Sequence, residues 1–141
     1  MISLEYPFFN NQPQIPIIIK SPLTRASIPV LALIDTGADN CLFPKHVPIR
    51  LGHTLNDRHG VSTGIGYGVE EKGIMTWSHP LVIGLADPTD YSVVAKNMRQ
   101  RMIECTDSDT TPVLLGTSNF LRYFKLTVDY KKKTVRLDLY E

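Results

Sequence analysis

Short apolar runs separated by turn-forming residues recur along this chain. The run from Ile28 to Ile34 is apolar, has β-branched residues at both ends and is too short for a stable helix. It therefore predicts a buried strand over Ala26 to Ile34. Ile15 to Lys20 predicts a second strand, and Ser21 to Arg25 supplies a turn between the two. This part of the chain is predicted to be a β-hairpin.

The C-terminal third carries a second pattern of this kind. Residues Leu126 to Tyr130 and Thr134 to Tyr140 alternate apolar and polar positions, which predicts a hairpin with the lysines 131–133 in its turn. Leu81 to Leu85 predicts a further strand. Helical spacing is found at Ser118 to Phe124, so one short C-terminal helix is expected. With 141 residues and no internal repeat, the pattern indicates one all-β domain.

Other stretches are less regular. Residues 1–14 place aromatic residues among asparagines and prolines, which predicts an extended N-terminal arm outside the core, suited to packing on a partner subunit. After Pro44 the chain is punctuated by Pro48 and Gly52, so irregular structure is expected there. Residues 88–111 are predicted to be a surface insertion loop. Within this range Tyr91 to Ala95 fits a strand, and Met98 to Glu104 fits either a strand or a helical turn.

Residues 59–77 are rich in glycine. A dinucleotide-binding fingerprint would need a further glycine where Val69 stands, and a helix after it, and the sequence has neither. A hairpin with its tip at Tyr67 to Lys72 fits better, because its glycines allow close approach of the backbone to a ligand.

Composition narrows the possible functions. The formal net charge of +1 gives no basic field for nucleic acid, and the lysine run lies in a predicted solvated turn. No apolar run approaches the length of a membrane span, and Met1 to Gln12 lacks the pattern of a signal peptide, so a cytoplasmic protein is expected. The two cysteines and four histidines lack metal-ligand spacing, and we expect neither a metal nor a cofactor.

Asp35 is the residue with the most informative surroundings. It directly follows the predicted strand that ends at Ile34, and carboxylates are seldom buried without a partner or a function. One interpretation is structural: Asp35 caps the following turn by accepting hydrogen bonds from the amides of Gly37 and Ala38. The wider sequence pattern favours a catalytic interpretation.

Three segments together resemble the retropepsins, the retroviral-type aspartic proteases, and their cellular relatives. The active-site loop of that family is matched by Asp35-Thr36-Gly37-Ala38 after two aliphatic residues. Its aliphatic-aliphatic-Gly strand and following helix are matched by Pro112-Val113-Leu114-Leu115-Gly116 and Asn119-Phe120-Leu121, and its glycine-rich flap by Gly64-Ile65-Gly66-Tyr67-Gly68. The resemblance extends from about Ile15 to Leu139. It implies a closed β-barrel, the single lobe of an acid protease, with a flap hairpin over 59–77.

The resemblance also implies a site and a reaction. The residues implied to be catalytic are Asp35, Thr36 and Gly37, and those implied to bind substrate are Ala38, Asp39, Ile65, Gly66, Tyr67 and Gly68. In such a site two carboxylates share one proton and activate a water against an extended polypeptide. The chain has one Asp-Thr-Gly, and Asp109-Thr110-Thr111 lacks the glycine. Catalysis therefore requires a homodimer with the site on its twofold axis.

One departure and two alternatives complete this interpretation. Retroviral members pair the acidic residue at the position of Asp39 with an arginine that directly follows the glycine at the position of Gly116. In this chain Thr117 stands there, in a segment that is one residue longer, and Arg122 is the nearest substitute.

A non-catalytic peptide-binding or dimerisation module of the same fold is the first alternative. The second, a phosphotransferase with an aspartate nucleophile, would need an acid at Gly37 and alternating helices.

Overall fold

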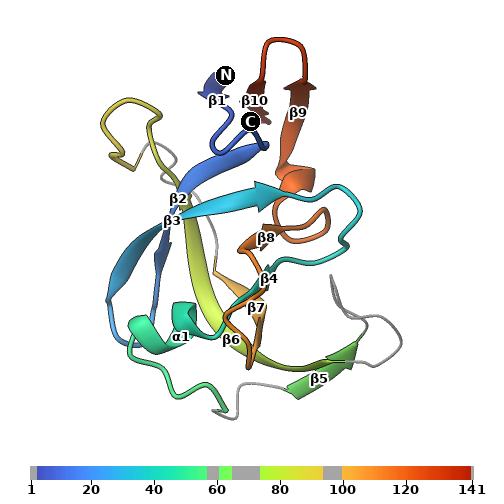
Figure 1. Cartoon of the computed structure of the whole chain (residues 1–141). Coiled ribbons are helices and arrows are strands. Elements are labelled where there is room, and N and C mark those ends of the chain that lie inside the picture. Colours follow the sequence, from blue (N-terminus) through green and yellow to red (C-terminus); the bar gives the residue numbers. More distant parts are fainter. Residues whose placement is uncertain (1–2, 57–60, 65–73, 94–99, 141) are drawn as a thin grey trace.

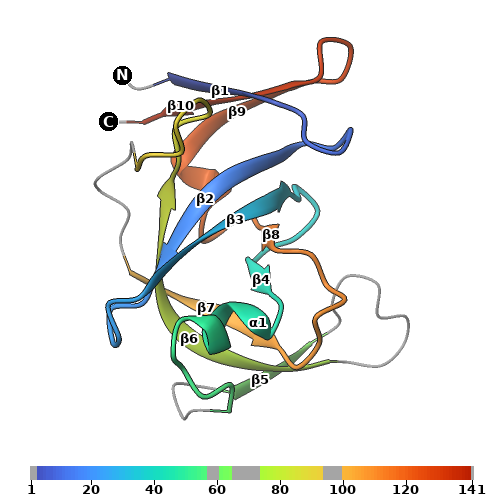
Figure 2. The same cartoon turned by 60° about the vertical axis from the view of Figure 1, so that its left-hand side comes forward.

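The computed structural model describes residues 3–56, 61–64, 74–93 and 100–140. The strands of these residues form two sheets, as Figures 1 and 2 show. In chain order the elements are β1 (Ser3–Pro7), β2 (Gln14–Lys20), β3 (Ser27–Ile34), β4 (Leu42–Phe43), α1 (His46–Arg50), β5 (Val61–Gly64), β6 (Ile74–Leu85), β7 (Arg101–Thr106), β8 (Leu114–Leu115), η1 (Leu121–Tyr123), β9 (Phe124–Asp129) and β10 (Thr134–Leu139).

The larger sheet has the strand order β2-β3-β8-β4-β7-β6-β5. Because β2 also pairs with β6, the sheet closes on itself and leaves β5 as an extension. Its interior is apolar and includes Ile17, Ile19, Ile83 and Ile103, each at most 2% exposed. The predicted all-β fold with a closed sheet is confirmed.

The hairpin of β2 and β3 is also confirmed, with Ile19 opposite Ile28. Along β3, Ile28, Ala32 and Ile34 are buried, whereas Leu31 is 39% exposed. The strand therefore buries one face fully, which corrects the expectation of a wholly buried strand. An apolar run is compatible with either arrangement, because only the neighbouring strands determine whether its second face is covered.

The connection between β3 and β4 determines the geometry of the site. These strands are consecutive in the chain, but β8 lies between them, parallel to β3 and antiparallel to β4. Residues 35–41 must therefore cross the end of β8 to reach β4. Figure 1 shows this loop at the edge of the molecule, away from the β2–β3 turn.

The smaller sheet has the order β1-β10-β9 and contains the predicted C-terminal hairpin. In both views it lies at the end of the molecule opposite β5. The expected N-terminal arm provides β1, and Tyr6 within it is fully buried, with its hydroxyl donating to the carbonyl of Ala86 at 2.8 Å. The prediction that this arm lies outside the core was therefore wrong. The prolines and asparagines around Tyr6 gave the segment no apolar periodicity from which a core strand could be predicted.

Two further elements differ from expectation. A quarter of the predicted insertion at 88–111 is β7, which pairs with β4 and β6 and buries Ile103 and Cys105. Of the two options for Met98 to Glu104, the structure has the strand, and the polar Glu104 separates its two buried side chains. The C-terminal helix is the single 3₁₀ turn η1, and an unexpected short helix, α1, contains Pro48 in its first turn, where proline is tolerated.

Three buried polar side chains form a connected chain between the β2–β3 turn and β6. His53 and His79 face each other with 3.0 Å between their Nδ1 atoms, and the Oγ of Ser21 lies 2.5 Å from Nε2 of His53. Nε2 of His79 lies 2.8 Å from the carbonyl oxygen of Leu55 and donates to it, since a carbonyl can only accept. These contacts connect the β2–β3 turn to β6.

None of the helices in the described residues has the length and apolar character needed to span a membrane.

Replacing Tyr6 by Phe tests whether β1 belongs to the core. Tyr6→Phe leaves the buried carbonyl of Ala86 without its donor, and we expect the free energy of unfolding to fall by about 1–3 kcal/mol in urea titrations. Tyr130→Phe is the matched control, because Tyr130 is 70% exposed. Equal stability of the two variants would show that β1 is not anchored as described.

Candidate active site

Asp35 lies immediately beyond β3 and is half-buried. Its backbone N–H donates to Leu115 at 3.1 Å, and the preceding N–H, from Ile34, donates to Pro13 at 3.0 Å. One carboxylate oxygen, Oδ1, accepts the N–H of Gly37 at 3.0 Å, whereas the N–H of Ala38 bonds to the backbone carbonyl of Asp35. The expected turn cap is therefore present at Gly37 alone. It orients the carboxylate.

The loop that carries Asp35 is held by residues just after β8. The backbone N–H of Thr117 donates to the carbonyl of Ala38 at 2.9 Å, and the N–H of Ser118 donates to the carbonyl of Asp39 at 2.7 Å. The Oγ of Ser118 donates to the same Asp39 carbonyl at 2.6 Å. The segment that departs from the family pattern thus holds the loop, and sequence reasoning missed this role because the contacts join residues about 79 positions apart.

Gly116 lies against the backbone of this loop. A Cβ atom at Gly116 would lie 2.4 Å from the carbonyl carbon of Asn40, closer than any real contact allows. The Gly116 N–H points at Sγ of Cys41, 3.4 Å away, and the N–H of Cys41 donates to the side chain of Asn119 at 2.9 Å. Burial raises the pKa of the Cys41 thiol to about 11, so this sulfur stays protonated at neutral pH.

The outer residues of the loop are accessible. Thr36, Gly37 and Asp39 are exposed, and within the described part of the chain the Thr36 hydroxyl makes no hydrogen bond. In the part of the chain that the structure describes, Arg122 does not pair with Asp39 as the missing arginine would. Its guanidinium lies over the ring of Tyr123, 5.7 Å from the centroid, and its backbone N–H donates to the carbonyl of Thr117.

The predicted flap is described only at its base. There β5 pairs with β6, with Val61 opposite Trp77 and Gly64 opposite Ile74. The implied substrate-binding residues Ile65, Gly66, Tyr67 and Gly68 lie outside the described residues.

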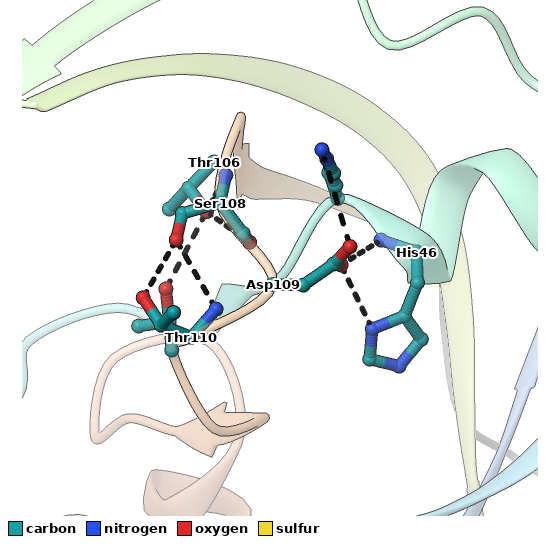
Figure 3. Close-up of polar contacts among 7 residues, drawn as sticks. His46, Thr106, Ser108, Asp109 and Thr110 are labelled. Carbon is teal, nitrogen blue, oxygen red and sulfur yellow. Dashed lines mark hydrogen bonds and ion pairs between the residues drawn. The ribbon is translucent and has the colours of Figure 1, made fainter.

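Asp109, the other acid in a partial motif, has a different role (Figure 3). Its Oδ1 accepts the backbone N–H of His46 at 3.0 Å and lies 3.2 Å from the Nδ1 of the same residue. Lys45 approaches the second oxygen at 4.0 Å. Asp109 thus caps the start of α1. Asp35 is therefore the carboxylate of the one complete Asp-Thr-Gly motif in this sequence.

The comparisons with known proteins concern the fold. Neither the protein-family models nor the curated proteins searched contain a match to this sequence. Among solved structures, the chain is similar to a retropepsin-like aspartic protease from Rickettsia conorii, with 16% sequence identity and a TM-score of 0.59 over 96% of this chain and 89% of that one.

Two other solved structures are similar at lower TM-scores. They are the EIAV protease complexed with the inhibitor HBY-793 (21% identity, TM-score 0.47, 82% of this chain and 92% of that one) and the retroviral protease-like domain of Ddi1 from Leishmania major (14% identity, TM-score 0.46, 92% and 95%). The similarity to the Rickettsia protein carries the assignment: the chain has the retropepsin-like fold.

Alanine substitution of the two glycines of the site tests the crossing, because it should destabilise the protein at Gly116 and not at Gly37. Gly116→Ala must displace the Asn40 backbone, so we expect the free energy of unfolding to fall by about 3 kcal/mol or more. Gly37→Ala is the matched control: its Cβ would meet only Oδ1 of Asp35, at an ordinary 3.4 Å. Denaturant unfolding of both variants checks this, and a stable Gly116→Ala variant would contradict the described crossing.

Proposed function

We propose that this chain is an aspartic endopeptidase in which two copies of Asp35 activate water against an extended polypeptide. The observation that carries the proposal is the placement of a half-buried, oriented carboxylate on an exposed loop that is braced from behind by the end of β8. A residue that served only as a turn cap would not need this second line of support. The retropepsin-like fold agrees with the proposal.

A homodimer follows from the number of carboxylates. The chemistry needs two acids that share a proton, and each chain supplies one motif aspartate, since Asp109 caps α1. Gly37 supports the same conclusion. A Cβ atom at this position would fit within its own chain, so packing inside the chain does not explain why the residue is glycine. A second chain or a substrate close to the loop would explain the glycine. Thr36 would then bond across the twofold axis.

In the proposed reaction one Asp35 carboxylate removes a proton from water, and the water oxygen bonds to the scissile carbonyl carbon. The protonated Asp35 of the other copy gives its proton to the carbonyl oxygen, which forms a neutral tetrahedral intermediate. When the C–N bond breaks, the carboxyl group that took the proton from water gives it to the leaving amine, and one hydroxyl of the intermediate gives its proton to the other Asp35 carboxylate as the C=O bond forms again. The pair ends with the same number of protons as at the start.

The substrate would lie as an extended strand between the Asp35 loops and the hairpins built on β5 and β6. Main-chain hydrogen bonds would hold it, and alternate side chains would enter apolar subsites. In this arrangement Ala38 and Asp39 border the substrate from the loop side, while Ile65 to Gly68 cover it as a flap. The proposal therefore expects cleavage within unstructured segments.

Replacing the proposed catalytic acid tests this function. An unfolded mixed-protein substrate is incubated with the wild type and with Asp35→Asn from mildly acidic to neutral pH, and the products are identified by mass spectrometry. We expect Asp35→Asn to reduce the cleavage rate by at least about a thousandfold, since no carboxylate remains to accept the proton of water. Pepstatin should slow the wild type.

The matched control is Asp107→Asn, which removes an exposed carboxylate outside the Asp-Thr-Gly motif and should leave cleavage unchanged. If the wild type and Asp35→Asn were equally inactive while both bound extended peptides, the site would belong to a non-catalytic binding module instead.

A further inference from the structure

Two arginines converge on the ring of Tyr123, the last residue of η1. The guanidinium carbon of Arg101, the first residue of β7, lies 4.9 Å from the centroid of this ring, and that of Arg122 lies 5.7 Å from it. Both distances are within the range of a cation–π contact. We call these three residues the Arg–Tyr cluster. It gathers two positive charges at one aromatic side chain.

The charge of the Arg–Tyr cluster is not neutralised by a neighbouring acid. Elsewhere in the described residues an arginine is paired with a carboxylate, as Arg136 is with Asp138 at 3.0 Å. Neither Arg101 nor Arg122 forms an ion pair with any residue that the structure describes. Arg122 and the ring of Tyr123 are exposed, and Arg101 is half-buried. The cluster is therefore a positively charged and accessible surface.

Most hydrogen-bond donors of the two guanidinium groups are also unused. A guanidinium has five N–H groups. Arg101 donates one of them, from Nη1 to the carbonyl of Gln100 at 3.2 Å, and the guanidinium of Arg122 donates none to the described residues. A guanidinium that lies over a ring can still direct the N–H groups at its edge to a carboxylate, two at a time. The cluster thus offers two such forks.

The three side chains stand on a backbone that is held in place. Arg101 is paired with Leu81 between β7 and β6. The N–H of Tyr123 donates to the carbonyl of Phe120 at 3.2 Å, and the carbonyl of Tyr123 accepts the N–H of Tyr140 at 3.4 Å. Contact with a fixed ring restricts both long arginine side chains before a ligand arrives, which lowers the entropy cost of binding.

Charge and spacing suit an acidic polypeptide. The two guanidinium carbons cannot lie further apart than the sum of their distances from the ring centroid. In an extended chain, side chains two residues apart lie on one face, about 7 Å from each other, so two acids at alternate positions can each reach one arginine. A nucleic-acid strand would need a longer track of cations, and the net charge of +1 provides no wider basic field.

The Arg–Tyr cluster is linked to the candidate active site through the backbone. The N–H of Arg122 donates to the carbonyl of Thr117 at 2.9 Å, and the N–H of Thr117 donates to the carbonyl of Ala38 at 2.9 Å. Two successive backbone hydrogen bonds therefore connect the cluster to the loop that carries Asp35. An unstructured polypeptide held at this loop brings its flanking residues within reach of the cluster.

We infer that Arg101, Arg122 and Tyr123 form a docking site for an acidic segment of the substrate, outside the segment that is cleaved. This inference rests on the proposed function for the identification of the polypeptide as a substrate. It specifies the substrate class as unstructured chains in which several Asp or Glu residues accompany the cleaved segment. Docking raises the local concentration of that segment at the active site, so it lowers KM and leaves the chemical step unchanged.

Direct binding tests the docking site without cleavage. Fluorescein-labelled hexaglutamate is titrated with the Asp35→Asn protein at low ionic strength, and its fluorescence anisotropy is measured. We expect hexaglutamate to bind and labelled hexaglutamine not to bind, because the carboxylates carry the interaction. Adding Arg101→Gln and Arg122→Gln should raise the dissociation constant at least about tenfold. The matched control is Arg25→Gln with Arg50→Gln, which removes two exposed cations elsewhere and should leave binding unchanged.

A second pair of variants guards against a folding defect. Arg101→Lys with Arg122→Lys keeps the charges and the apolar stems but not the forks, so hexaglutamate should bind it more weakly than wild type and more tightly than the glutamine pair. Equal binding by the glutamine pair and the wild type would overturn the inference, as would no binding of hexaglutamate. Tighter binding of a labelled oligothymidine of the same length would overturn it in favour of a nucleic acid.

Cleavage kinetics test whether the docked segment belongs to the substrate. A cleavable peptide is compared with the same peptide carrying a hexaglutamate tail on a Gly/Ser linker of about ten residues, which spans roughly 16–19 Å. We expect the tail to lower KM at least about fivefold in the wild type with kcat unchanged, and to have no effect in the Arg101→Gln, Arg122→Gln protein. A tail effect of equal size in both proteins would overturn the inference.

The two experiments separate this inference from the proposed function. Cleavage by the wild type without any effect of the tail would overturn the docking site and leave the endopeptidase intact. Binding of hexaglutamate that depends on both arginines, with no cleavage by the wild type, would support a site for acidic segments and count against the endopeptidase.

Discussion

The contact between Gly116 and the backbone of Asn40 is the constraint on which the site depends. It allows the end of β8 to pass beneath the loop that joins β3 to β4, at a distance that leaves no room for a Cβ atom. Once the two segments are in contact, Thr117 and Ser118 bind the carbonyls of Ala38 and Asp39. The position of Asp35 thus follows from packing between segments that are far apart in the sequence.

This arrangement supports the loop from the inside and leaves its outer surface accessible. Cys41 and Asn119 complete the inner support, and because burial raises the pKa of the Cys41 thiol, this sulfur adds no charge there. Thr36, Gly37 and Asp39 remain exposed on the outer side. A loop braced on one side and accessible on the other is suited to meeting a second copy of itself, which would supply the second carboxylate.

Local patterns predicted the elements whose burial alternates regularly. The hairpins of β2 with β3 and of β9 with β10 were predicted correctly, because each strand buries one face and adjoins its partner in sequence. Strand β7 was predicted only as one of two options for Met98 to Glu104, since the polar Glu104 separates Ile103 from Cys105, and its partners β4 and β6 precede it by many residues. The Asp35 motif was recognisable, but its support by Thr117 and Ser118 depends on a crossing that no local pattern encodes. The catalytic and substrate-binding assignments stay predictions.

The measurement that most directly tests the central claim is cleavage by mixtures of wild type and Asp35→Asn at constant total concentration, after subunit exchange. If one site needs Asp35 from two chains, mixed dimers are inactive, and activity falls as the square of the wild-type fraction, to about a quarter in an equal mixture. If each chain carried a complete site, activity would fall in simple proportion to the wild-type fraction. A proportional decrease would contradict the account.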